Sequence, residues 1–181
     1  MRDRVAGDLA ATGLVLAWDQ SSHEETGFDQ LYTVAPSAMP QIAAVFAACE
    51  YFLEMLTCVD LRQTESRMRL VYTFNCFGPH DRHRVSADLA PTRPWTGPPP
   101  KKPKRAPPAA DGVVENAAAP TESIGVSIVS VFAAADWYER EVHEMFGVEF
   151  SGHPKLKRLL LPDDADFFPL LRDFGRIEDA P

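Results

Sequence analysis

The chain has 181 residues, of which 45% are hydrophobic and 24% are charged, and its formal net charge is −8. This length and composition are typical of one ordinary domain with a sizeable core. The negative charge disfavours nucleic acid or an anionic membrane surface as the main partner, because both would repel the average field of the chain.

The first thirteen residues, MRDRVAGDLAATG, lack the apolar run of a secretory signal, which favours a cytoplasmic protein. We expect them to form a frayed, polar N-terminal tail ahead of a single domain at 14–177. The longest apolar runs, 42–49 and 126–135, are shorter than the roughly 20 residues that cross a bilayer. We therefore expect membrane association only through other proteins.

Five segments that are apolar or alternate in polarity predict β-strands, namely 14–19, 31–35, 53–61, 68–77 and 84–89. Apolar residues at helical spacing from Ile42 to Cys49 predict a helix at about 39–50, with Pro40 in its first turn. The polar residues at 62–67 predict a hairpin connection. Together these elements predict an α+β fold, an antiparallel sheet with helices packed on one side.

Cysteine and histidine residues give little sign of a metal centre. Cys49, Cys58 and Cys76 form no C-x-x-C pair and are typical of buried thiols in a reducing compartment. An iron–sulfur cluster needs about four thiolates, so we expect none held by this chain alone. His80 and His83 flank a turn, but no clear third or fourth ligand accompanies them.

Proline dominates the segment 91–120, which also carries the basic cluster Lys101, Lys102, Lys104 and Arg105. Proline lacks a backbone donor, so this segment cannot sustain a helix or a central strand. We expect a long flexible loop inserted ahead of the C-terminal helix. An alternative to a simple spacer is a binding function, in which the basic cluster docks an acidic neighbour or lipid headgroups.

The stretch 136–154, DWYEREVHEMFGVEFSGHP, predicts a helix followed by a sharp corner. We expect Asp136 to be its N-cap, with Glu139 completing a capping box, and Gly147 to end it. An apolar stripe from Tyr138 to Phe146 predicts the buried face, and Glu144 is among the charged residues expected to face away from it. The residues before it, 124–132, predict a strand or a short helix.

No nucleotide-binding, zinc-protease or serine-hydrolase motif occurs in the sequence. Glu139 and His143 are one helical turn apart and His153 lies beyond the corner, which is a poor catalytic or metal-binding set. A structural role is favoured, in which charged side chains hold the corner through charge-assisted hydrogen bonds. The dense charge on this helix is also typical of a solvated surface with internal ion pairs.

The segment 137–162, WYEREVHEMFGVEFSGHPKLKRLLLP, and the following PLLRDF at 169–174 resemble the signature of the 30-kDa subunit family of respiratory complex I, known in bacteria as the C subunit. The same domain occurs in energy-converting membrane-bound NiFe hydrogenases. The family usually closes this signature with Pro-Leu-Arg-Lys-Asp, whereas this chain has Leu171-Arg172-Asp173 and no lysine there. The residues that carry the resemblance are Glu139, Arg140, Glu141, Phe146, Gly147, Gly152, His153, Pro154, Arg158, Leu159, Leu160, Pro169 and Asp173.

The resemblance implies a cofactor-free subunit in the peripheral arm of a proton-translocating NADH:quinone oxidoreductase, on the cytoplasmic side of the inner membrane. There it would scaffold the hydrogenase-like large subunit near the quinone end of the electron path. The complex would use NADH, FMN, iron–sulfur clusters and quinone, whereas this chain would contribute no catalytic, cofactor-binding or metal-binding residue. A hydrogenase subunit and a free-standing adaptor remain the alternatives. The resemblance and the pattern together suggest interface or corner-stabilising roles for Glu139, Arg140, Glu141, Phe146, Gly147, Gly152, His153, Pro154, Arg158, Arg172 and Asp173.

Overall fold

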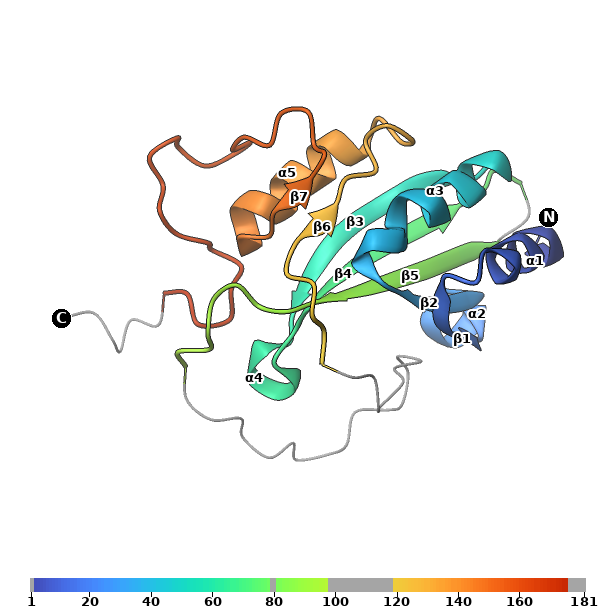
Figure 1. The fold of residues 1–181 in the computed structure, drawn as a ribbon, viewed down its shortest axis with the longest axis horizontal. Coiled ribbons are helices and arrows are strands. Elements are labelled where there is room, and N and C mark those ends of the chain that lie inside the picture. Colours follow the sequence, from blue (N-terminus) through green and yellow to red (C-terminus); the bar gives the residue numbers. More distant parts are fainter. Residues whose placement is uncertain (1, 79–80, 98–118, 176–181) are drawn as a thin grey trace.

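The computed structural model of the protein describes residues 2–78, 81–97 and 119–175 (Figure 1). Its centre is a five-stranded sheet with the strand order β1-β2-β5-β4-β3. All five predicted strands are confirmed to within two residues at either end, as β1 Val15–Gln20, β2 Gln30–Val34, β3 Phe52–Asp60, β4 Met68–Asn75 and β5 Arg82–Leu89.

The sheet is antiparallel except at one pair of strands. β5 runs antiparallel to β4 but parallel to β2, with Tyr32 opposite Val85. A parallel pair requires a crossover connection, which the α3–β3–β4 segment provides. The β3–β4 connection contains a short helix, α4 Arg62–Glu65, in place of a simple hairpin loop. Leu70, Tyr72 and Phe74 share one face of β4, as predicted, and all three are fully buried.

Two helices cover that buried face (Figure 1). The first, α3 Met39–Ala48, follows a short 3₁₀ turn, η1 Pro36–Ala38, and the second is α5 Ala135–Phe146. Phe74 stacks on Phe46 of α3 with ring centroids 4.2 Å apart and lies 5.6 Å from Phe132, just before α5. Both helices therefore pack on the same side of the sheet, and the predicted α+β fold is confirmed.

The N-terminal residues form a helix, α1 Arg2–Thr12, where we expected a frayed tail. Val5 and Leu9 lie four residues apart on one face of this helix and are completely buried in the core. They are joined by few other apolar residues, so the helical pattern is hard to recognise in the sequence. A second short helix, α2 His23–Thr26, links β1 to β2.

The strand predicted at 124–132 is much shorter in the structure, where only β6 Gly125–Val126 is extended. It pairs in parallel with β7 Phe150–Ser151. Beyond it the Ser127 hydroxyl accepts the Val129 N–H at 3.3 Å, and the Ile128 carbonyl accepts two further N–H groups. These local bonds turn the chain toward α5 instead of continuing the strand.

Most of the proline-rich segment, including its basic cluster, lies outside the described residues, so the flexible loop expected at 91–120 stays a prediction. Its described flanks come together, because the Ala90 N–H donates to the Glu122 carbonyl at 2.7 Å. No described helix is both long enough and apolar enough to cross a membrane.

Candidate functional site

The signature helix α5 begins at Ala135, two residues earlier than expected, and Asp136 is not its N-cap. The residue at the N-cap is Ala134, and no side chain caps the helix. Turn carbonyls of Phe132 and Ala133 instead accept the first N–H groups of the helix. The predicted capping box is therefore wrong, and the Glu139 carboxylate is available for another contact.

The buried face of α5 contains charge as well as apolar side chains. Val142 is buried and Tyr138 packs against the core, as expected, and the Tyr138 hydroxyl donates to the Glu54 carbonyl at 2.8 Å. Glu139 and Glu144 are also fully buried, although we expected Glu144 to face away from the apolar stripe. Each carboxylate is tolerated because backbone N–H groups reach it.

Glu144 binds the chain that follows the corner, which we call the arm (residues 155–161). Its carboxylate accepts the N–H groups of Leu159 and Leu160, each at 2.8 Å, and of Leu161 at 3.1 Å. Burial raises the pKa of Glu144, but these three bonds and the nearby Arg158 outweigh it and hold the pKa below its usual value. Glu144 is therefore ionised at neutral pH.

Arg140, one turn earlier on α5, binds the same arm through carbonyl groups. Its Nε donates to the Lys157 carbonyl at 2.9 Å and its Nη2 to the Arg158 carbonyl at 2.8 Å. The Arg158 side chain in turn donates to the Ala165 carbonyl. Arg140 and Glu144 thus hold five consecutive arm residues through their main chain alone.

Glycine is required at the start of the corner for two reasons. Gly147 has φ +74°, and a Cβ there would lie 3.1 Å from the ring of Phe168. Its N–H donates to the His143 carbonyl at 2.9 Å and closes the helix, as predicted. Gly152 has φ +79° at the second bend of the corner.

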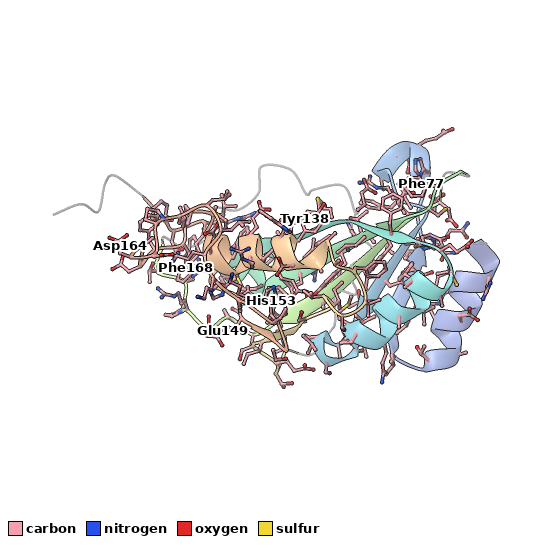
Figure 2. All side chains as sticks on the ribbon, turned by 90° about the horizontal axis from the view of Figure 1, so that it is seen from above. Phe77, Tyr138, Glu149, His153, Asp164 and Phe168 are labelled. Carbon is pink, nitrogen blue, oxygen red and sulfur yellow. The ribbon has the colours of Figure 1, made fainter. Side chains whose placement is uncertain are left out.

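His153 follows this bend, and its side chain is completely buried beside α5 (Figure 2). Its Nδ1 accepts the Lys155 N–H at 3.0 Å, which places the ring proton on Nε2. Nε2 lies 3.3 Å from Oδ1 of Asp136 and 4.0 Å from Oε2 of Glu139. The structure therefore brings Glu139 and His153 together, but His143 instead contacts the Val148 carbonyl through Nδ1 at 2.9 Å.

Glu139 is the least satisfied of the buried charged groups on α5. Its Oε1 accepts the Ile128 N–H at 2.8 Å, whereas its Oε2 has no hydrogen-bond partner among the described residues. Burial, with a smaller contribution from the Asp136 charge, raises the pKa of Glu139 to about 7, against the opposing effects of the Ile128 N–H and the Ser127 hydroxyl.

Asp173, at the end of the signature, joins a buried ion network that sequence reasoning missed. Arg62 of α4 is bidentate to Asp60, at 2.9 and 2.8 Å, and donates to Asp173 at 2.5 Å. The second oxygen of Asp173 accepts the Thr96 hydroxyl at 2.8 Å. Arg172 contributes its backbone N–H, which donates to Asp60 at 3.0 Å, while the residue itself is exposed. The only sequence signal was a charged pair two residues apart, with Asp60 near the end of the predicted strand 53–61 and Arg62 at the start of the polar connection 62–67.

The remaining signature residues divide between core and surface. Phe146 packs against the hydrophobic core, whereas Glu141 and Pro154 are exposed. Large apolar side chains are also exposed in the arm and in the tail (residues 162–175), with exposed fractions of 68% for Leu160, 52% for Leu170 and 45% for Phe174. The main chain of these segments is thus held in place while part of their apolar surface faces solvent.

A groove of about 320 Å³ lies between the tail and the segment 93–96. Within it Arg93 lies over the Phe168 ring at 4.5 Å, and Phe167 stacks on Phe174 with centroids 5.3 Å apart. Phe168 lies near the α5 end of the molecule, while Phe77 lies at the far end (Figure 2). The groove is lined by Arg62, Arg93, Pro94, Thr96, Asp166, Phe167, Phe168, Leu171, Asp173 and Phe174.

The described residues include no group of three or more His, Cys, Asp or Glu side chains placed to hold a metal. His80 lies outside the described residues, and the His83 ring is completely buried, with Nε2 2.9 Å from Oδ1 of Asp81. Cys49, Cys58 and Cys76 are buried free thiols, as predicted.

These features define a small α+β domain whose signature helix fastens a C-terminal arm, and comparison with known proteins shows which proteins it resembles. The family model of the respiratory-chain NADH dehydrogenase 30 Kd subunit matches residues 113–179. The resemblance seen in the signature is therefore confirmed.

The individual relatives carry related names. The C subunit of the NADH-quinone oxidoreductase of Rhodobacter capsulatus is 36% identical over 129 residues, covering 71% of this chain and 50% of that protein. The C subunit of the same enzyme from Chloroherpeton thalassium is 46% identical over 48 residues, covering 26% of this chain and 20% of that protein. The chain thus spans half or less of the length of these curated relatives.

Two solved structures share the fold. One is from a membrane-bound sulfane sulfur reductase, an archaeal respiratory membrane complex, with a TM-score of 0.58 and 18% identity over 82% of this chain and 73% of that chain. The other is a trypsin-resistant fragment of Nqo5, with a TM-score of 0.54 and 19% identity over 86% of this chain and all of that fragment.

Proposed function

We propose that this chain is a cofactor-free subunit in the peripheral arm of a proton-translocating NADH:quinone oxidoreductase. In this role it scaffolds the hydrogenase-like large subunit near the quinone end of the electron path. The match at 113–179 and the names of the curated relatives support the proposal. The oxidoreductase activity belongs to the complex, in which other subunits bind NADH, FMN, iron–sulfur clusters and quinone.

The observation that carries this proposal is the combination of a fixed backbone with exposed apolar side chains. Arg140 and Glu144 hold the arm, and Arg62 holds the tail through Asp173. Leu160 and Leu170 are nevertheless more than half exposed. Apolar side chains on a preorganised segment suit burial by a partner protein, because little conformational entropy is then lost on binding.

Localisation follows from this assembly. In the proposed complex the subunit lies on the cytoplasmic side of the inner membrane and is attached through its partners. The net charge of −8 is consistent with the absence of nucleic acid among its partners.

Affinity purification of the tagged native protein in mild detergent, followed by mass spectrometry, tests the assignment. We expect NADH-binding, cluster-binding and antiporter-like membrane subunits to copurify. A large subunit with intact NiFe-binding cysteines would instead move the chain to a membrane-bound hydrogenase. A protein that purified alone would refute both assignments and favour a free-standing adaptor.

Replacing Leu160 with aspartate is expected to lower the recovery of partner subunits by on the order of tenfold, because a buried interface contact of this size contributes about 1.4 kcal/mol or more. The side chain is 68% exposed, so the fold should survive the change. Leu16→Asp is the matched control, because Leu16 is 70% exposed and lies on β1, away from the arm. Equal recovery from the two variants would exclude the arm as the interface.

Replacing Arg140 with alanine is expected to loosen the arm, because two charge-assisted bonds to the Lys157 and Arg158 carbonyls are lost. Backbone amides at 159–161 should then exchange their hydrogens about tenfold faster, corresponding to roughly 1.4 kcal/mol of lost local stability. Partner recovery should fall in parallel. Glu141→Ala, an exposed change on the same helix, should leave exchange at 159–161 unaltered. Unchanged exchange in the Arg140 variant would contradict the role we give this side chain.

A further inference from the structure

The corner beside α5 contains more buried polar groups than its hydrogen bonds satisfy. Glu139 and the His153 side chain are both completely buried, yet Nε2 of His153 and Oε2 of Glu139 are 4.0 Å apart. This separation is too long for a hydrogen bond. The Tyr72 hydroxyl of β4, which interacts electrostatically with Glu139, also has no hydrogen-bond partner among the described residues.

The groups that face Glu139 do not supply a balancing positive charge. Asp136, one turn earlier on α5, is a second carboxylate. Ser127 and the Ile128 N–H face it from the preceding loop, and the uncharged Tyr72 faces it from β4, with Cys58 of β3 beyond. Within the part of the chain that the structure describes, the basic group that lies near the Glu139 carboxylate is the His153 ring, at 4.0 Å.

His153 is poorly placed to become that positive charge. Its Nδ1 accepts the Lys155 N–H at 3.0 Å, so a second ring proton would point at this donor and break the bond. The neutral ring keeps its single proton on Nε2, which faces the Asp136 carbonyl at 3.4 Å and the Asp136 carboxylate at 3.3 Å. The proton acceptor of this cluster is therefore Glu139.

We propose that Glu139, together with Asp136 and His153, forms a proton-binding site in which one proton from solvent binds Oε2 of Glu139 and holds the second bend of the corner (residues 152–154) against α5. Binding of the proton removes the uncompensated buried charge. When the proton leaves, a buried charge without a hydrogen-bonded partner remains on Oε2, and opening of the corner exposes this charge to water. The corner is thus fastened by a neutral carboxyl and loosened by an ionised one.

The direction of the pH dependence follows from the raised pKa of Glu139, about 7 against an ordinary value of 4.5. The folded state binds this proton more tightly than the unfolded state. The resulting stabilisation is fully present at pH values below the ordinary pKa of 4.5. It is lost as the pH rises through the folded-state pKa of about 7. Between about pH 4.5 and pH 8 this group changes the unfolding equilibrium constant on the order of a hundredfold.

The decisive experiment is a titration of the full chain carrying ¹³C-labelled glutamate, followed by NMR. We expect one glutamate carboxyl carbon to titrate near pH 7, and this signal should be absent in Glu139→Gln and retained in Glu141→Gln, which changes an exposed residue of the same helix. The ring resonances of His153 should report the same transition, because the ring lies beside Glu139. An ordinary titration of Glu139, or a His153 ring that itself becomes doubly protonated near pH 7, would overturn the proposal.

Unfolding measurements give an independent check. The unfolding midpoint of Glu139→Gln should vary less between about pH 5 and pH 8 than that of Glu141→Gln, since glutamine resembles the protonated acid and does not ionise. Identical pH profiles for the two variants would also overturn the proposal. Neither measurement depends on the assembled complex, so this inference stands or fails apart from the proposed function.

Discussion

Replacement of Glu144 with alanine is expected to lower the free energy of unfolding by about 3 kcal/mol, since hydrogen bonds to a charged acceptor contribute more than neutral ones. The ionised carboxylate accepts three consecutive N–H groups of the arm, and alanine leaves all of them without this acceptor. Part of the loss is recovered from water, because Leu160 is exposed. Denaturant unfolding gives the free energy, and hydrogen exchange at 159–161 locates the damage.

The same variant should show a defined pH dependence. The pKa of Glu144 is depressed in the folded state. The stabilisation that the ionised carboxylate provides is therefore present at pH values above the ordinary pKa of 4.5, and it is lost as the pH falls through the lower pKa of the folded state. The difference between wild type and Glu144→Ala should therefore shrink in acid. Glu141→Ala, which removes an exposed glutamate from the same helix, should change stability by less than about 0.5 kcal/mol. If the two variants were equally stable, Glu144 would not anchor the arm.

Replacement of Arg62 with methionine is expected to lower the free energy of unfolding by about 3–5 kcal/mol, the usual effect of removing one partner from a buried ion pair. Arg62 is 4% exposed and lies between Asp60 and Asp173, whose negative charges would then remain buried or be forced to protonate. The tail should detach from α4, because Asp173 loses its contact with this guanidinium.

Two control variants make this prediction specific. Arg4→Met removes one partner of an exposed pair with Asp8 on α1 and should have an effect of about 0–1 kcal/mol. Arg62→Lys should not restore stability, because an ammonium group cannot reproduce the bidentate contact with Asp60. Full rescue by lysine would mean that charge alone, not the planar geometry, holds the network.

The sheet and the two covering helices could be predicted from the sequence because their signals are periodic. Leu70, Tyr72 and Phe74 alternate along β4, and the spacing of apolar residues in α3 and α5 matches one helical face. The end of α5 at Gly147 was also predictable, since its φ of +74° favours glycine. These patterns do not indicate the direction in which two distant strands pair. The parallel pairing of β2 with β5 was therefore not predicted.

The chemistry of the site was less predictable than its position. Sequence reasoning expected Glu139 to complete a capping box and Glu144 to face away from the apolar stripe, yet both find backbone donors supplied by segments up to 17 residues away. The Arg62–Asp173 contact spans 111 residues. A charged side chain that is buried by such partners looks the same in a sequence as one that is solvated, and the helical period cannot separate them.

The contacts between α5 and the arm fix the path of the arm separately from the side chains on its surface. Arg140 and Glu144 recognise only carbonyl and N–H groups of residues 157–161, which every amino acid other than proline offers alike. These bonds therefore place no requirement on the side chains of residues 157–161, among which only Arg158 makes a further contact described above, to the Ala165 carbonyl. Substitutions there can alter what the surface recognises while its path along α5 stays the same, so binding preference can diverge among related proteins without a change of architecture.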